Sequence, residues 1–169
     1  HDPILLRAEL LLRKIRDTID ESVSLAKAGK DSATYLLVFE PSHPLRFIVD
    51  AGGQVRSLHA TSAGKAFLGS LSAEQFESWL KTAKLVPMTA KTIRSKDELR
   101  KDIEVSKRRG YYLNQAESFD DATTVSSLFR WQGASYIVTI AGPTSRMADK
   151  FDQAVKLVTE ACKTLGEGG

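Results

Sequence analysis

Cysteine is almost absent from this chain, which has one, Cys162, among its 169 residues. A single cysteine excludes an intrachain disulfide and fits a reducing cytoplasm. Because Cys162 falls on the apolar side of a predicted helix, we expect a small core residue and not a nucleophile. No paired-cysteine or His-Glu-x-x-His spacing occurs, so no metal site is expected. His59 precedes a predicted helix, and we favour a structural role over a ligating one.

Long apolar runs and signal-peptide patterns are also missing. No stretch approaches the roughly 20 apolar residues that a membrane-spanning helix needs. The hydrophobic fraction of 42% and charged fraction of 27% are typical of a globular protein, predicted here to be cytoplasmic and to form one domain over residues 1–169. The net charge of +3 is too small to indicate nucleic-acid binding by itself. The chain begins without Met, so we expect part of a longer gene product.

Signatures of catalysis are absent too. Gly64-Lys65 fails as a phosphate-binding loop because His59 and Ala66 stand where Gly and Ser or Thr are required. Lys65 is therefore expected to be a solvated helix residue. No Gly-x-Ser-x-Gly elbow is present, so we predict neither catalytic residues nor a cofactor. The basic run 107–109 is expected to be solvated at the end of a helix.

The first predicted element is a leading helix over residues 1–29. Pro3 suits a first helical turn, an apolar stripe runs from Ile4 to Val23, and Gly29 is a natural C-terminal cap. Outside that stripe lie three further leucines, which predict contact with another domain or subunit. These are Leu5, Leu6 and Leu10.

The remaining pattern predicts strands alternating with helices. Ser72 and the capping box of Ser95 and Glu98 begin helices, Gly110 ends one, and Gln132-Gly133 is typical of a hairpin turn. Residues 166–169 are expected to be a disordered tail. The order indicates an α+β fold with a largely antiparallel central sheet and covering helices. Strands are predicted over 33–40, 45–50, 112–117, 123–131 and 135–141, and helices over 62–69, 73–81, 96–109 and from 144 or 145 onward.

Two spaced segments carry a family resemblance. The first is Leu58-His-Ala-Thr-Ser-Ala-Gly-Lys-Ala-Phe-Leu68, and the second passes Arg109-Gly-Tyr-Tyr112 and Glu117 and ends at Ile140-Ala-Gly-Pro143 and Ser145-Arg146. From about Ile4 to Leu165 the chain resembles the C-terminal effector-binding domain of IclR-type bacterial transcription regulators. The resemblance implies a GAF/PAS-like sensor fold, dimers or tetramers, and DNA binding only through an N-terminal winged helix-turn-helix domain, which is absent from this chain.

The resemblance also implies six effector-binding residues: Ser62, Ala63, Asn114, Thr124, Thr139 and Ala141. Main-chain N–H groups near Ser62 begin a helix and can hold a carboxylate without a basic side chain. The Asn and Thr side chains are neutral donors and acceptors that can orient a small polar ligand. Alternatively, the Ser62 hydroxyl only caps its helix and the threonines only reflect strand propensity.

The sequence departs from the family in the loop 118–122. Asp121 replaces a common Gly and Leu128 a common Pro, and Asp120 and Asp121 would oppose an anionic ligand unless they point away.

The leading hypothesis remains a domain that binds a small organic effector, with a carboxylic acid as the suggested class. The alternatives are an enzyme with an unrecognised polar site and an interaction module. In the latter, Phe47, Ile48, Phe119 or Phe129 would fill the pocket.

Overall fold

A computed structural model describes residues 3–47 and 49–169. One five-stranded sheet in the order β2-β1-β5-β4-β3 forms the centre, and every neighbouring pair of strands is antiparallel. The fold is therefore α+β with an antiparallel sheet, as the sequence predicted. The elements are α1 (Pro3–Ile19), β1 (Ser22–Ala28), β2 (Ala33–Phe39), α2 (Ser62–Ser70), α3 (Ala73–Thr82), α4 (Lys96–Arg109), β3 (Tyr112–Gln115), β4 (Ala122–Trp131), β5 (Ala134–Pro143), α5 (Thr144–Met147) and α6 (Phe151–Gly166).

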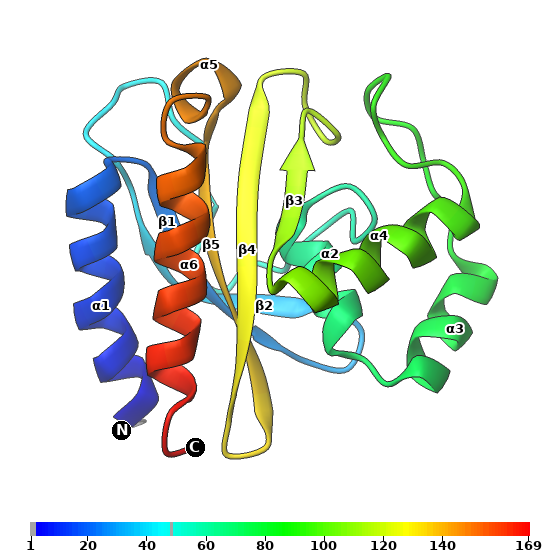
Figure 1. Ribbon diagram of the computed structural model, residues 1–169, viewed down its shortest axis with the longest axis horizontal. Helices are drawn as coiled ribbons and strands as arrows, with labels where there is room; N and C mark the ends of the chain where they lie inside the picture. The colour runs from blue at the N-terminus through cyan, green and yellow to red at the C-terminus, as the bar shows by residue number, and fades with distance from the viewer. Residues whose placement is uncertain (1–2, 48) are drawn as a thin grey trace.

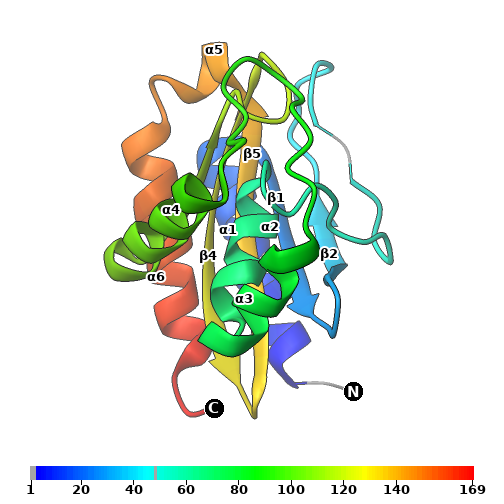
Figure 2. The same ribbon diagram turned by 90° about the vertical axis from the view of Figure 1, so that its right-hand side faces the viewer.

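Helices cover both faces of the sheet. α1 and α6 lie side by side on one face, and α2 packs on the other, with α4 and α3 beyond it (Figures 1 and 2). Alternate residues of each strand point to opposite faces, so Val23 and Leu25 enter the core under α1 and α6 while Ala26 joins the core under α2. Among the described residues, no helix is both long and apolar enough to cross a membrane.

The leading helix is shorter than the sequence predicted, and this prediction was wrong beyond Ile19. Asp20 has a positive φ of 51°, which turns the chain, and Ser22–Ala28 forms β1, an inner strand between β2 and β5. The spacing from Ile19 to Val23 fits a helix, whereas the spacing from Val23 to Leu25 fits a strand, and the helical spacing extended the prediction too far. Such a short segment fits both periods.

The predicted strand over 45–50 was also wrong. Its described residues, 45–47 and 49–50, belong to no strand, and Ile48 lies outside the described residues. The carbonyl of Phe47 accepts a hydrogen bond from the Ser22 hydroxyl at 2.8 Å instead of joining a ladder. This segment therefore runs past the end of β1 as a connection.

Local signals at helix ends and turns were read correctly. Ser72 accepts a hydrogen bond from the Gln75 N–H in a full capping box, and Ser95 caps α4 through the Glu98 N–H. Gly110 ends α4 with φ 91°.

The last predicted helix is divided into α5 and α6, and Gly166, expected in a disordered tail, is the final residue of α6. The division lets Lys150 donate to the Ile19 carbonyl at 2.8 Å.

Candidate functional site

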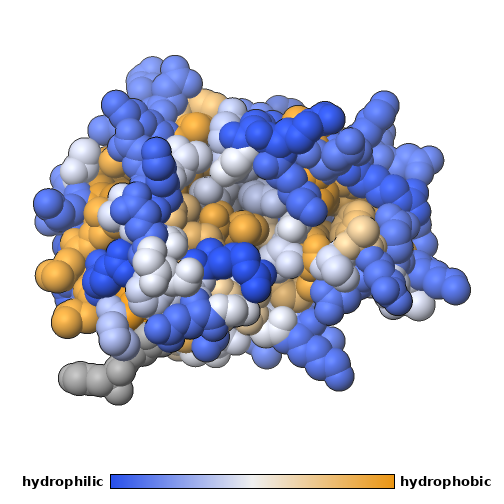
Figure 3. Space-filling view, turned by 60° about the horizontal axis from the view of Figure 1, so that its bottom comes forward, coloured by the Kyte–Doolittle hydropathy of each residue, from blue (hydrophilic) through white to orange (hydrophobic). Residues whose placement is uncertain are grey.

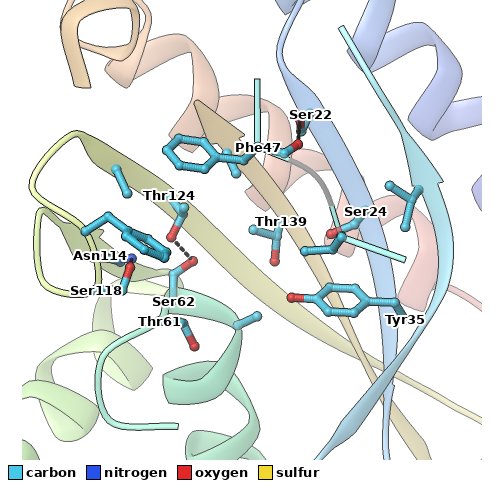
Figure 4. A pocket seen from close by; sticks show the side chains of 16 residues that line it. Ser22, Ser24, Tyr35, Phe47, Thr61, Ser62, Asn114, Ser118, Thr124 and Thr139 are labelled. Atoms are coloured by element: carbon cyan, nitrogen blue, oxygen red, sulfur yellow. Dashed lines mark hydrogen bonds between the residues drawn. The ribbon is translucent and has the colours of Figure 1, made fainter. Parts of the chain in front are cut away.

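A cavity of about 180 Å³ lies between the start of α2 and the sheet (Figure 4). One water molecule needs only roughly 10–15 Å³, so the space suits a larger guest. All six residues implied by the resemblance line this cavity. The lining residues are Ser22, Ser24, Tyr35, Val38, Phe47, Val49, Thr61, Ser62, Ala63, Asn114, Ser118, Phe119, Ala122, Thr124, Thr139 and Ala141.

The register of the sheet explains why residues distant in sequence meet here. Three rows of paired residues cross the strands on the face that carries α2. The first row is apolar and packs in the core, and the next two rows are largely hydroxyl or amide side chains that face the cavity. The rows are Ala26–Ile137–Leu128, Ser24–Thr139–Ser126 and Ser22–Ala141–Thr124–Asn114.

Four hydroxyls from these rows and α2 form a hydrogen-bonded chain. Ser62 Oγ lies 2.6 Å from Thr124 Oγ1 and 2.8 Å from Ser126 Oγ, and Ser126 Oγ lies 2.6 Å from Thr139 Oγ1. Four hydroxyls carry four protons, and three contacts use three of them. The chain therefore retains one O–H donor for a further partner.

The first turn of α2 presents free main-chain donors. Thr61 is the N-cap, and its side chain accepts from the Gly64 N–H at 3.0 Å. Among the described residues, the N–H groups of Ser62 and Ala63 have no acceptor. The alternative that the Ser62 hydroxyl only caps its helix is therefore wrong, because Thr61 is the cap.

Gly64 allows this helix to start so close to the preceding turn. A Cβ on Gly64 would lie 2.5 Å from the Cα of Leu58. Any larger residue would push the start of α2 away from the turn, and so away from the cavity. The Gly of the quoted segment thus positions a helix terminus and does not bind a phosphate.

Asn114 shapes the wall of the cavity at the end of β3. Its Nδ2 donates to Ser118 Oγ at 2.7 Å, and its Oδ1 accepts from the Glu117 N–H at 2.8 Å. Ala116, which lies between Asn114 and Ser118 in the chain, has a positive φ of 60°. The buried amide therefore closes the turn that carries Ser118 and Phe119 to the cavity.

The described lining residues carry no formal charge. Asp120 and Asp121 are exposed and are not among them. Burial raises the pKa of the Tyr35 phenol, so it remains a neutral donor near pH 7.

Phe47 and Phe119 line the cavity without closing it, whereas Phe129 stacks on Tyr136 on the opposite face of the sheet. Ile48 lies outside the described residues.

Lys65 is not the solvated residue that the sequence predicted. It is 1% exposed, and its Nζ lies 2.6 Å from Asp102 Oδ2, 2.7 Å from Glu117 Oε1 and 2.8 Å from the Leu113 carbonyl oxygen. A buried ammonium needs such partners. The carboxylates come from α4 and from the turn after β3, so no local pattern around Lys65 shows them.

Two other residues have the structural roles expected from the sequence. His59 is 6% exposed, and its Nε2 lies 2.9 Å from the Val86 carbonyl oxygen. Cys162 is buried in the core under α6, where desolvation raises the pKa of its thiol to about 12. A thiol protonated at neutral pH is a poor nucleophile.

An antiparallel sheet covered by helices, with an uncharged cavity under a helix N-terminus, has the architecture of a GAF/PAS-like sensor domain. The sequence profile of "Bacterial transcriptional regulator IclR C-terminal" matches residues 1–166. The chain therefore belongs to the IclR family of transcription regulators and corresponds to the C-terminal effector-binding domain.

Individual relatives agree with this assignment. The acetate operon repressor of Salmonella typhimurium is 30% identical over 166 residues, which cover 94% of this chain and 60% of that protein. The structure of an IclR effector domain from Acinetobacter sp. ADP1 matches with a TM-score of 0.81 and 20% identity over 97% of this chain and 96% of that one. An IclR homolog from Microbacterium hydrocarbonoxydans, complexed with 4-hydroxybenzoate, matches with a TM-score of 0.85 and 18% identity over 96% and 66%.

Proposed function

We propose that the cavity binds a small organic effector and that binding changes the operator affinity of a DNA-binding domain in the full-length regulator. One observation carries the proposal: six residues taken from the family pattern, on four separate elements, line a single cavity. The chain spans 60% of the length of the acetate operon repressor, and the region outside the match would supply the DNA contacts.

The effector class that the cavity supports best is a carboxylic acid. The N–H groups of Ser62 and Ala63 lie at the positive end of α2 and lack protein acceptors among the described residues. No acidic side chain lines the described wall of the cavity to oppose an anion. The relative complexed with 4-hydroxybenzoate, a carboxylate, supports the same class.

Signalling requires that the effector bind two states of the regulator unequally. A coupling free energy of about 1–3 kcal/mol would change operator affinity roughly 5- to 150-fold. We propose that the two states differ in how copies of this domain associate. Exposed leucines on α1 support this idea, since Leu6 and Leu10 are each 63% exposed. Figure 3 shows hydrophobic atoms gathered at the side of the molecule where α1 lies.

We further propose that the cytoplasmic full-length protein is not an enzyme and uses no cofactor. Hydrolytic or proton-transfer chemistry needs a general base or an activated nucleophile. The described walls of the cavity contain no His, Cys, Lys, Asp or Glu, and the hydroxyl of Ser62 bonds only to other hydroxyls. Turnover of a bound acid, abolished by Asn114→Ala, would contradict this proposal.

A thermal-shift screen against small carboxylic, sugar and aromatic acids tests the sensor function. A ligand at about 100 times its dissociation constant should stabilise the fold by about 2.7 kcal/mol. The shift should disappear in Asn114→Ala and Thr139→Val but persist in Thr159→Val. In that control the altered hydroxyl bonds to the Val155 carbonyl within α6. Absence of any shift across the panel would count against the carboxylate class.

A further inference from the structure

Two hydroxyls on the wall of the cavity remote from α2 have no protein partner among the described residues. They belong to Ser24 on β1 and Tyr35 on β2, and both line the cavity. Figure 4 shows them on the opposite side of the cavity from Ser62, with Thr139 between. Ser24 is 6% exposed, so most of the residue is shielded from bulk water, and its hydroxyl makes no hydrogen bond to the described residues. A buried polar group in this condition costs free energy unless a guest satisfies it.

The neighbouring hydroxyls of the same rows are satisfied. Ser22 donates to the Phe47 carbonyl at 2.8 Å, and Thr139, which pairs with Ser24 in the sheet, bonds to Ser126. The lack of a partner is therefore specific to Ser24 and Tyr35 and is not a general property of this face. Because the pair faces open space in the cavity, a guest molecule can reach both hydroxyls.

We propose that Ser24 and Tyr35 form a second polar subsite, which binds an uncharged oxygen, a hydroxyl or carbonyl, at the end of the effector remote from α2. The inference rests on the proposed function, in which the effector carboxylate sits at Ser62 and Ala63. Apolar side chains also line the cavity, including Val38, Phe47 and Ala141. The effector is thus a monocarboxylic acid with an apolar middle and a distal hydroxyl or keto group.

The subsite excludes a second carboxylate for an electrostatic reason. Among the described lining residues no Lys, Arg or His is present to neutralise a second anion. Lys27, on the same strand as Ser24, points instead to the Tyr136 ring on the opposite face of the sheet, with its Nζ 5.7 Å from the centroid. A buried anion without a counter-charge is strongly disfavoured. A dicarboxylate should therefore bind more weakly than the hydroxy acid of similar length.

Calorimetric titration with two matched series tests the subsite. One series is benzoate, 4-hydroxybenzoate and terephthalate, and the other is butyrate, 4-hydroxybutyrate and succinate. In the wild-type domain we expect the hydroxy acid of at least one series to bind roughly 2- to 10-fold more tightly than its parent, and the dicarboxylate more weakly than the hydroxy acid. Tyr35→Phe and Ser24→Ala should lower the affinity for the hydroxy acid more than the affinity for its parent, and so reduce the hydroxy advantage.

Tyr136→Phe is the matched control, because Tyr136 packs on the other face of the sheet against Phe129. It should retain the hydroxy advantage. Equal binding of parent and hydroxy acid, an advantage that survives in both Tyr35→Phe and Ser24→Ala, or a dicarboxylate as tight as the hydroxy acid would overturn the subsite while leaving the carboxylate anchor intact. If no member of either series binds, the anchor itself fails, and the subsite fails with it.

Discussion

The ammonium of Lys65 lies 2.7 Å from Oε1 of Glu117, and this contact joins α2 to the turn that follows β3. Lys65 is three residues after Ser62 on the same helix, so the contact helps to set where the first turn of α2 sits above the cavity. The turn after β3 is also closed by the Asn114 side chain, whose Oδ1 accepts a hydrogen bond from the Glu117 N–H. The Lys65–Glu117 ion pair thus links α2, whose first turn carries the free N–H donors, to the turn after β3 on the facing wall of the cavity.

Replacing Lys65 with Met should lower the free energy of unfolding by roughly 3–5 kcal/mol, because two mostly buried carboxylates lose their counter-charge. Urea denaturation measures this change. Lys84→Met, at an exposed position away from these carboxylates, is the control and should alter stability by less than about 0.5 kcal/mol. A Lys65→Met domain as stable as the control would show that the ion pair contributes nothing.

Ser62→Ala should destabilise the domain by roughly 1–3 kcal/mol, because both Thr124 and Ser126 lose a hydrogen-bond partner. Thermal unfolding without ligand measures the loss. Ser78→Ala, on the exposed side of α3, gives the background for a Ser-to-Ala change in a helix. Equal melting temperatures for the two variants would mean that the hydroxyl chain does not stabilise the fold.

Acid should weaken the fold through Glu21, whose side chain is fully buried. Burial raises the pKa of its carboxyl, but hydrogen bonds from Arg146 and Lys150 outweigh this effect and leave the pKa below its usual 4.5. A pKa lowered in the folded state stabilises the protein above the unfolded-state pKa, and the stabilisation is lost as pH falls through the folded-state value. The unfolding free energy should therefore fall as pH drops below about 4.5.

Glu21→Gln separates this contribution from that of other acids. The variant should be less stable at neutral pH and lose less stability on acidification, because Gln does not titrate. Denaturation across the acid range measures both slopes. Glu104→Gln, at an exposed position on α4, should keep the wild-type slope. Parallel acid profiles for wild type and Glu21→Gln would rule out the proposed linkage.

Association of the domain should depend on the exposed leucines of α1. Replacing Leu6 and Leu10 together with Glu should weaken self-association by on the order of tenfold or more, because each buried leucine contributes roughly 1.5–3 kcal/mol. Sedimentation equilibrium measures the change. Val86→Glu, 56% exposed in the connection between α3 and α4, should not affect it. A wild-type domain that stays monomeric at high concentration would contradict the proposed interface.

Much of the local structure could be predicted because its causes are local. Ser72, Ser95 and Gly110 mark helix ends through hydrogen bonds and backbone angles within a few residues of themselves. The hairpin at Gln132-Gly133 forms because both residues adopt positive φ, at 49° and 80°. The six cavity residues were found in another way, from spacings shared with a family, and periodicity alone would not have selected them.

Only the tertiary structure decided the features that depend on distant partners. Ser22–Ala28 is a strand because β2 and β5 pair with both its edges, although its apolar spacing also fits a helix. Lys65 is buried because Asp102 and Glu117 are brought to it, and Ser24 and Tyr35 share a cavity because β1 and β2 are neighbours. The sequence by itself determined the caps, the turns and the family, since neighbouring residues carry those signals. Burial and pairing depend on contacts between segments far apart in the chain, which no short sequence window contains.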